Sequence, residues 1–254
     1  MPYCKIEGGL NMLEYGSVGV YGKIPTHGDF LNLNLPSDFM EAWDHWLQQS
    51  VLASQEVLGG EWLTHFLISP VWRFVLPGDC ANGQSWAGIM LPSVDKVGRY
   101  YPLTLAAPVS SQIGTFEYIS KAEQWFQWLE DVAITTLEQG LEADDLIQAL
   151  NQNPVPLECS NKSVSALIPE RKLQRVVPLE ASLEPIMNIM PLLCDALVKP
   201  QSSNLSLWWT KGGEHVASAL LLADKLPRPI SYTAMLNGQW ENWHWPNLFH
   251  LTGS

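Results

Sequence analysis

The stretch from Val71 to Val109, VWRFVLPGDCANGQSWAGIMLPSVDKVGRYYPLTLAAPV, contains three apolar runs that decide the fold. These runs, Val71–Leu76, Trp86–Leu91 and Leu103–Val109, are rich in β-branched and aromatic residues, which is typical of strands. The links GDCANG and SVDKVG are too short for helical crossovers between parallel strands. The stretch therefore predicts an antiparallel meander.

Helices and further strands are expected on both sides of this meander. Residues 1–16 show no clear period and are predicted to be an irregular arm, followed by a strand at Ser17–Gly22. After Pro36, Ser37 is expected to cap a helix that ends at Gly59-Gly60. Its apolar stripe, at helical spacing, consists of Phe39, Trp43, Trp46, Leu47 and Val51. A brief helix is expected over Glu61–Leu67.

The second half continues with both element types. Phe116–Gln139 is predicted to be one long helix, with Asp144–Asn151 a short helix and Asn153–Lys162 a loop or linker. Ser182–Leu197 is predicted to be helical, with a kink or break at Pro191. The remaining predicted strands are Leu205–Thr210, Ala217–Ala223 and Ser231–Leu236, the first two joined as a hairpin through KGGE.

Together these elements predict one α/β domain of α+β-like type over residues 17–254. Its central sheet is expected to be mixed but largely antiparallel, with helices flanking both faces.

Composition restricts the function classes. The chain has 254 residues, 46% of them hydrophobic, and a net charge of -12. This excess of acid disfavours nucleic acid and anionic membrane surfaces as partners. No apolar run approaches the roughly 20 residues needed to span a bilayer, and no secretory signal is visible. We therefore expect a cytoplasmic protein with no membrane insertion.

The cysteines and tryptophans are interpreted as core residues. The four cysteines lie far apart, which is untypical of a zinc site, so we expect free buried thiols at Cys4, Cys80, Cys159 and Cys194. Trp62, Trp72, Trp125 and Trp128 have core spacing. Adjacent strand residues point to opposite faces, so Trp208 and Trp209 should pack on the two sides of the sheet. The terminal cluster of Trp240, Trp243, Trp245 and Phe249 is either a packed tail or an exposed aromatic patch for a partner, and packing is expected.

Two loops rich in glycine and proline carry the candidate site residues, for binding a partner or an anion. GVYGKIPTHGDF, at 19–30, contributes Lys23, His27 and Asp29, and LPSVDKVGRYYPL, at 91–103, contributes Asp95 and Arg99. Asp95 and Arg99 are expected to clamp their own loop as an ion pair. Because isolated charges among apolar strands need partners, we expect the loops to meet. Asp29 or Asp95 should then pair with Lys23, Arg73 or Arg99.

Patterns for catalysis are incomplete. Gly22-Lys23 lacks the earlier glycine and the following hydroxyl of a phosphate loop, so Lys23 is expected to be solvated or paired to Asp29. Ser85 resembles a hydrolase nucleophile but should enter a strand rather than a strand-to-helix turn. His27-Gly28-Asp29 and Asp44-His45 offer possible metal ligands without an i,i+4 histidine pair. We expect no catalytic residue, metal or cofactor.

A set of motifs occurs in one order along the chain. The dense ones are GKIPTHGDF at 22–30, LPSDFMEAWDHWLQ at 35–48, WLTHFLISPVWRF at 62–74 and WAGIMLPSVDKVGRYYPLTLA at 86–106. Weaker ones follow as WFQWLE, SLWWTKGG and YTAMLNG. This set resembles the TagF (ImpM-like) family of type VI secretion system-associated proteins, and the resemblance covers nearly the whole chain.

The resemblance implies an accessory protein of a contractile injection machine of Gram-negative bacteria. Relatives act after translation as repressors of its assembly or firing. Some are thought to act by binding a forkhead-associated scaffold protein, alongside a kinase and phosphatase pair. Other type VI secretion components are the partners that the resemblance implies.

Two classes of function stay open from the sequence. The first is a non-enzymatic repressor that works through protein–protein interaction. The alternative is an uncharacterised hydrolase or nucleotide-binding enzyme that uses the Lys23–Asp29 and Asp95–Arg99 loops. A dry charged cluster without an activated nucleophile would favour the repressor, and a pocket of these residues around an anion would favour the enzyme.

Overall fold

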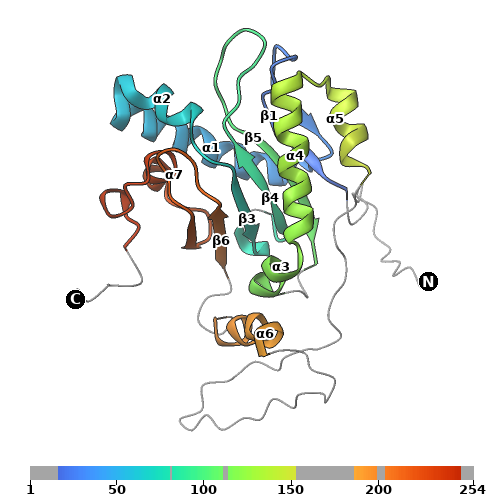
Figure 1. Ribbon diagram of the computed structural model, residues 1–254, viewed down its shortest axis with the longest axis vertical. Helices are drawn as coiled ribbons and strands as arrows, with labels where there is room; N and C mark the ends of the chain where they lie inside the picture. Colours follow the sequence, from blue (N-terminus) through green and yellow to red (C-terminus); the bar gives the residue numbers. More distant parts are fainter. Residues whose placement is uncertain (1–16, 81, 111–113, 153–185, 199–203, 247–254) are drawn as a thin grey trace.

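The computed structural model describes residues 17–80, 82–110, 114–152, 186–198 and 204–246 of the chain (Figure 1). The expectations for residues 1–16 and 153–162, and for Cys4, Cys159 and Phe249, lie outside these ranges.

A seven-stranded sheet forms the centre of the fold, in the order β2-β1-β5-β4-β3-β6-β7. Each neighbouring pair is antiparallel, which confirms the predicted largely antiparallel sheet. The predicted meander forms β3, β4 and β5 at the middle of this order. The strands are β1 Gly19–Gly22, β2 Leu31–Leu33, β3 Trp72–Leu76, β4 Ser85–Leu91, β5 Leu103–Val109, β6 Leu205–Thr210 and β7 Ala219–Asp224.

One face of the sheet is covered by α1 (Ser37–Leu58), α2 (Trp62–Leu67) and α7 (Tyr232–Asn237), with η1 (Gly59–Glu61) joining the first two. The predicted apolar stripe of α1 is buried throughout. The Trp43 ring lies 4.8 Å from Phe74 and 6.0 Å from Trp208, while its Nε1 donates to Thr104 Oγ1 at 3.0 Å. An aromatic core thus fixes α1 across the central strands.

The opposite face is covered by α3 (Thr115–Lys121), α4 (Glu123–Gln139) and α5 (Ala143–Leu150) (Figure 1). The expectation of one helix over Phe116–Gln139 is wrong, because the helix breaks at Ala122, where φ is -98° and ψ is 12°. The break lets Tyr118 contact Trp125 and Phe126 edge-on, at 6.2 and 6.1 Å. Tertiary packing here outweighs the helical period of the sequence.

Helix α6 (Ile186–Val198) contacts α3 at the foot of the molecule in this view (Figure 1). The Asp195 carboxylate accepts hydrogen bonds of 3.0 Å from the backbone N–H groups of Phe116 and Glu117, in the first turn of α3. The helix continues through Pro191, so of the predicted kink or break the break does not occur. Within the described ranges, no helix combines the length and apolar character needed to cross a membrane.

Two further sequence predictions are wrong. Ser231–Leu236 forms η3 (Pro229–Ser231) and α7 instead of a strand. A short apolar run buried on all sides cannot be assigned by periodicity alone, and α7 is buried at every position. The helix α1 also begins with Pro36 rather than Ser37 at its N-cap, and no side chain caps it.

The tryptophans follow the sequence prediction closely. Trp208 belongs to the core under α1, whereas Trp209 packs against the core under α4. Trp240 and Trp245 pack against the α1 side, as expected for a packed cluster. Cys80 is buried as predicted, whereas Cys194 is only half-buried.

Candidate functional site

The candidate site is a cluster of charges that joins the β1–β2 loop to the β4–β5 loop. Lys23 Nζ lies 2.8 Å from Asp95 Oδ2, and Arg99 Nε lies 2.7 Å from the same oxygen. The Arg99 guanidinium also donates to the carbonyl oxygen of Gly28, which ties the two loops together a second time. The predicted meeting of the loops and the Asp95–Arg99 clamp are therefore confirmed.

The Asp95 carboxylate is the centre of this cluster and is fully buried. Its Oδ1 accepts the backbone N–H groups of Val97 at 3.0 Å and Arg99 at 2.8 Å. Burial by itself raises the pKa of Asp95, but the hydrogen bonds from Lys23, Arg99 and Val97 outweigh it. They hold the pKa well below its usual range. The carboxylate stays charged and its oxygens are occupied by internal donors.

Lys23 is not solvated and does not pair with Asp29, contrary to both expectations. Only 4% of its surface is exposed, and its ammonium lies 4.9 Å from the centre of the Phe30 ring. Its backbone carbonyl accepts a hydrogen bond of 2.6 Å from Ser93 Oγ. Both ends of Lys23 thus hold the second loop in place.

A glycine is needed at position 22 for backbone geometry and packing, not for phosphate binding. Gly22 lies at φ 125°, where a side chain would be strained, and a Cβ atom would sit 2.1 Å from the carbonyl oxygen of Pro102. The glycine before Lys23 therefore allows close contact between the two loops.

Two predicted site residues lie on the exposed rim of the cluster. His27 and Asp29 are both exposed, and the His27 carbonyl oxygen accepts the Lys96 N–H at 3.0 Å. Asp29 Oδ1 accepts the N–H of Phe30 at 2.8 Å and makes no ion pair within the described residues. Arg99, with 56% of its side chain exposed, completes the rim. Lys23 and Asp95 are the buried base, and His27, Asp29 and Arg99 are the accessible part.

A neighbouring polar group was missed in the sequence. Asp44 Oδ1, on α1, accepts hydrogen bonds from the hydroxyls of Tyr21 and Tyr101, the latter at 2.9 Å. Burial and the Asp44 charge raise the pKa of both tyrosines. The Phe30 ring lies 4.9 Å from Tyr101 and so connects this group to the charge cluster. The sequence pattern suggests Asp44 only as a possible metal ligand.

Arg73 makes a second ion cluster on the other face of the sheet, rather than joining Asp29 or Asp95. Its guanidinium bonds to Glu130 and Glu123 of α4, each at 2.6 Å. Burial alone lowers the pKa of Arg73, but the two carboxylates more than offset it and raise the pKa. Arg73 is 1% exposed, and this cluster fastens α4 to β3.

The other chemical candidates show no assembled site. Ser85 is the first residue of β4 and pairs with Val109, as a strand residue does. In the described part of the chain, no group of three or more histidine, cysteine or acidic side chains could hold a metal ion.

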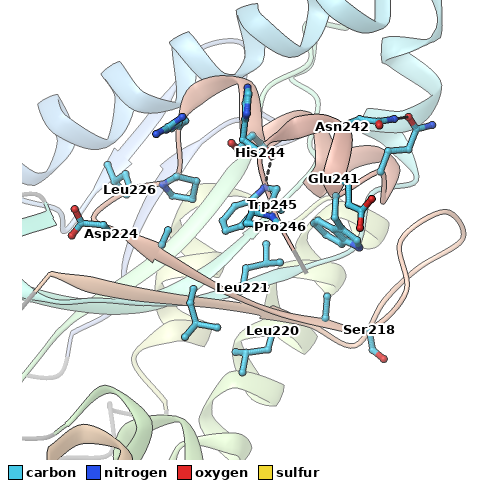
Figure 2. Close-up of a pocket in the computed structure, with 18 residues that line it drawn as sticks. Ser218, Leu220, Leu221, Asp224, Leu226, Glu241, Asn242, His244, Trp245 and Pro246 are labelled. Atoms are coloured by element: carbon cyan, nitrogen blue, oxygen red, sulfur yellow. Dashed lines mark hydrogen bonds between the residues drawn. The ribbon is translucent and has the colours of Figure 1, made fainter. Parts of the chain in front are cut away.

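A groove lies elsewhere, between β7 and the C-terminal segment (Figure 2). Leu221 points toward Trp245 across this groove, and Glu241 and Asp224 lie along its length. Of its lining, Trp240 and Trp245 belong to the terminal aromatic cluster, for which the sequence offers packing or a partner-binding patch.

Comparisons of sequence and of structure find similar proteins. The sequence profile of the TagF N-terminal domain, which is type VI secretion system-associated, matches residues 19–153. The crystal structure of PA0076 from Pseudomonas aeruginosa PAO1 is similar, with a TM-score of 0.75 and 29% sequence identity. This match covers 94% of the present chain and 99% of that chain. A search of curated protein sequences gives no match.

Proposed function

The chain belongs to the TagF family of type VI secretion system-associated proteins, and we propose that it is a non-enzymatic, post-translational repressor of type VI secretion. It acts in the cytoplasm by binding a component of the secretion system, for which the forkhead-associated scaffold protein is the leading candidate. Repression then depends on occupancy of a surface and requires no turnover.

The observation that carries this proposal is the saturation of Asp95. Its two oxygens accept from Lys23, Arg99 and two backbone N–H groups, so no lone pair faces a substrate. A general base or nucleophile must reach the reacting atom and have an open site for it. The buried charges of the two loops hold the loop backbones in place, which supports a binding role over an enzymatic one.

The same cluster supports a defined binding surface. His27, Asp29 and Arg99 lie on loops whose bases are fixed by buried ion pairs. A surface that is held in its bound shape loses less conformational entropy when a partner binds. The rim carries both signs of charge, whereas the chain as a whole has a net charge of -12, so a basic or neutral partner surface is favoured.

Binding to the scaffold can be measured by calorimetry with both purified full-length proteins. We expect saturable binding, and we expect Asp29→Lys to raise Kd about tenfold or more through reversed charge at the rim. Glu56→Lys is the matched control. Glu56 is also exposed, but it lies about three helical turns along α1 from Asp44, which neighbours the charge cluster, and so lies away from the rim.

Absence of binding by two folded proteins would exclude the scaffold as direct partner. Equal effects of the two charge reversals would exclude the rim as the contact surface.

The enzymatic alternative has its own test. The phosphate cradle is incomplete and Lys23 is buried against Asp95, so neither ATP nor magnesium should bind with micromolar affinity. Calorimetry with both ligands together should give only heats of dilution. A saturable nucleotide site would contradict the repressor proposal and favour the enzymatic alternative.

A further inference from the structure

The strand β7 ends the sheet in an unusual way for an exposed edge. It is six residues long, ALLLAD, and no strand in the described ranges pairs with its outer side. Natural edge strands are commonly protected by lysine, proline, a bulge or shortness. None of these occurs within β7, whose single charged residue is Asp224 at its end.

The backbone direction of β7 follows from one hydrogen bond. The Lys225 N–H donates to the Asn204 carbonyl oxygen at 2.8 Å, just beyond the last β6–β7 pair. Antiparallel pairs alternate between bonded and non-bonded, so Ala219, Leu221 and Ala223 face β6. The N–H and C=O groups of Leu220, Leu222 and Asp224 therefore point away from the sheet. Three donors and three acceptors are available to another strand.

The side chains at these outward positions are apolar and accessible. Leu220 is 53% exposed and Leu222 is 40% exposed. Leu220 pairs with Trp209, so both leucines lie on the α4 side of the sheet. Leu221 points into the groove on the opposite side, as Figure 2 shows. The edge thus combines free backbone groups with two leucines two residues apart.

Charge restricts what can occupy this edge. Asp224, at the end of the strand, and Glu241, on the groove, are exposed and acidic, whereas the exposed Lys225 and Arg228 beside them are basic, so the local charge is mixed and the net charge of the whole chain decides. Two copies of a chain with a net charge of -12 repel each other, which disfavours β7–β7 self-pairing. The same net negative charge attracts a segment with basic ends.

We propose that β7 is a docking edge for an extended segment of a partner protein, which adds to the sheet as an eighth strand. Backbone hydrogen bonds from Leu220, Leu222 and Asp224 supply affinity. Alternate apolar side chains of the segment cover the two exposed leucines, and a basic residue faces Asp224. In strand addition of this kind, every second side chain of the added segment contacts the protein, so segments are selected by their apolar pattern and their charge. This inference goes beyond the proposed function, because it assigns a separate surface and a recognition chemistry.

Residue-resolved hydrogen exchange of the full chain tests the proposal. The probe is a synthetic peptide of alternating valine and threonine with lysine at both ends. In the protein alone, the amides of Leu220, Leu222 and Asp224 should exchange quickly, and those of Leu221 and Ala223 slowly. At a peptide concentration about ten times Kd, the fast amides should slow about tenfold. The same peptide with glutamate ends should protect them less.

Two variants separate the contribution of the Asp224 charge to peptide binding from that of the outward backbone hydrogen bonds. Asp224→Lys should reverse the preference, so that the glutamate-ended peptide protects better than the lysine-ended one. Leu222→Pro removes one outward N–H without removing a β6–β7 bond, and should abolish protection at Leu220. If that variant unfolds, Asp224→Lys still decides the matter, because the residue is exposed.

Three results would overturn the proposal. Slow exchange of the three outward amides in the monomer alone would mean that the chain covers its own edge. Protection that rises with protein concentration, with a dimer in sedimentation, would assign the edge to a second copy. Failure of the lysine-ended peptide to protect the three amides would exclude strand addition at β7.

Discussion

At one end of the sheet, β2 is three residues long and follows a loop held down by Lys23 and Asp95, whereas β7 at the other end is six residues long with its outer side unpaired among the described strands. At the first end, the charged side chains pair with one another inside the protein, and these ion pairs hold the exposed rim in a fixed shape. The second end keeps hydrogen-bonding groups and leucines available. In this protein the buried charges hold the loops in place, and the two surfaces that we propose for binding are accessible: the charged rim above those loops and the outward backbone of β7.

The largest expected effect concerns buried charge as a structural device. Arg73→Met should lower the free energy of unfolding by about 3 kcal/mol, near the lower end for breaking a buried ion pair, because Lys211 still neutralises Glu130. The matched control is Lys211→Met, since Lys211 is 55% exposed and its pairs should contribute under about 1 kcal/mol. Urea unfolding of both variants measures this difference. Equal losses of unfolding free energy in the two variants would contradict the claim that the buried charge stabilises the fold more than the exposed one.

The next effect compares adjacent leucines of β7. Leu221 is buried under the C-terminal segment, so Leu221→Ala should cost about 2 kcal/mol of unfolding free energy. Leu222 is exposed, so Leu222→Ala should change stability by less than about 0.5 kcal/mol. Thermal and urea unfolding provide the values. A cost at Leu222 as large as at Leu221 would show that the outer face of β7 is already packed in the isolated chain.

The smallest expected effect is a shift in acid stability at the loop end. The pKa of Asp95 is depressed in the folded state, so its contribution is present above the unfolded pKa, near 4, and is lost as the pH falls below it. Lys23→Met breaks a buried ion pair, so it should lower stability at neutral pH, and the smaller effect concerns pH: it removes a donor and should bring the pKa of Asp95 closer to the ordinary value. The stability of the variant should then depend less on pH below about 4, with an acid midpoint shifted by under about one pH unit.

Urea unfolding from pH 2.5 to 6 on both proteins gives the test. The difference between wild type and variant isolates Asp95 from the other carboxylates. A difference that does not depend on pH would mean that Lys23 stabilises the fold by packing alone.

Much of the fold could be predicted from local pattern, because the strands and α1 bury regular apolar faces. The meander and the stripe from Phe39 to Val51 follow directly from alternation and helical spacing. The failures occur where tertiary contacts decide the outcome. Ala122 breaks a continuous helical pattern, and the run from Tyr232 is buried on all sides, which removes the periodicity.

The sequence predicts that charges of the two loops pair, but it predicts the geometry of the cluster only in part. Opposite charges in two glycine-containing loops indicated that the loops meet, and Asp95 does pair with Lys23 and Arg99. Which residues are buried depends on contacts far apart in sequence, so Lys23 could not be distinguished from the exposed Asp29. The outward backbone of β7 has no sequence signal, because it depends on strand order and register.

A secretion titration tests the central claim, repression by stoichiometric binding, most directly. The protein is expressed in a host deletion strain from an adjustable promoter, and secretion of the system's tube protein is measured against the intracellular amount of repressor. We predict that deletion raises basal secretion. Secretion should then fall in proportion to the repressor until its amount equals that of the partner. Unchanged secretion with soluble, folded protein would contradict the account, as would complete repression at a small fraction of the partner's amount.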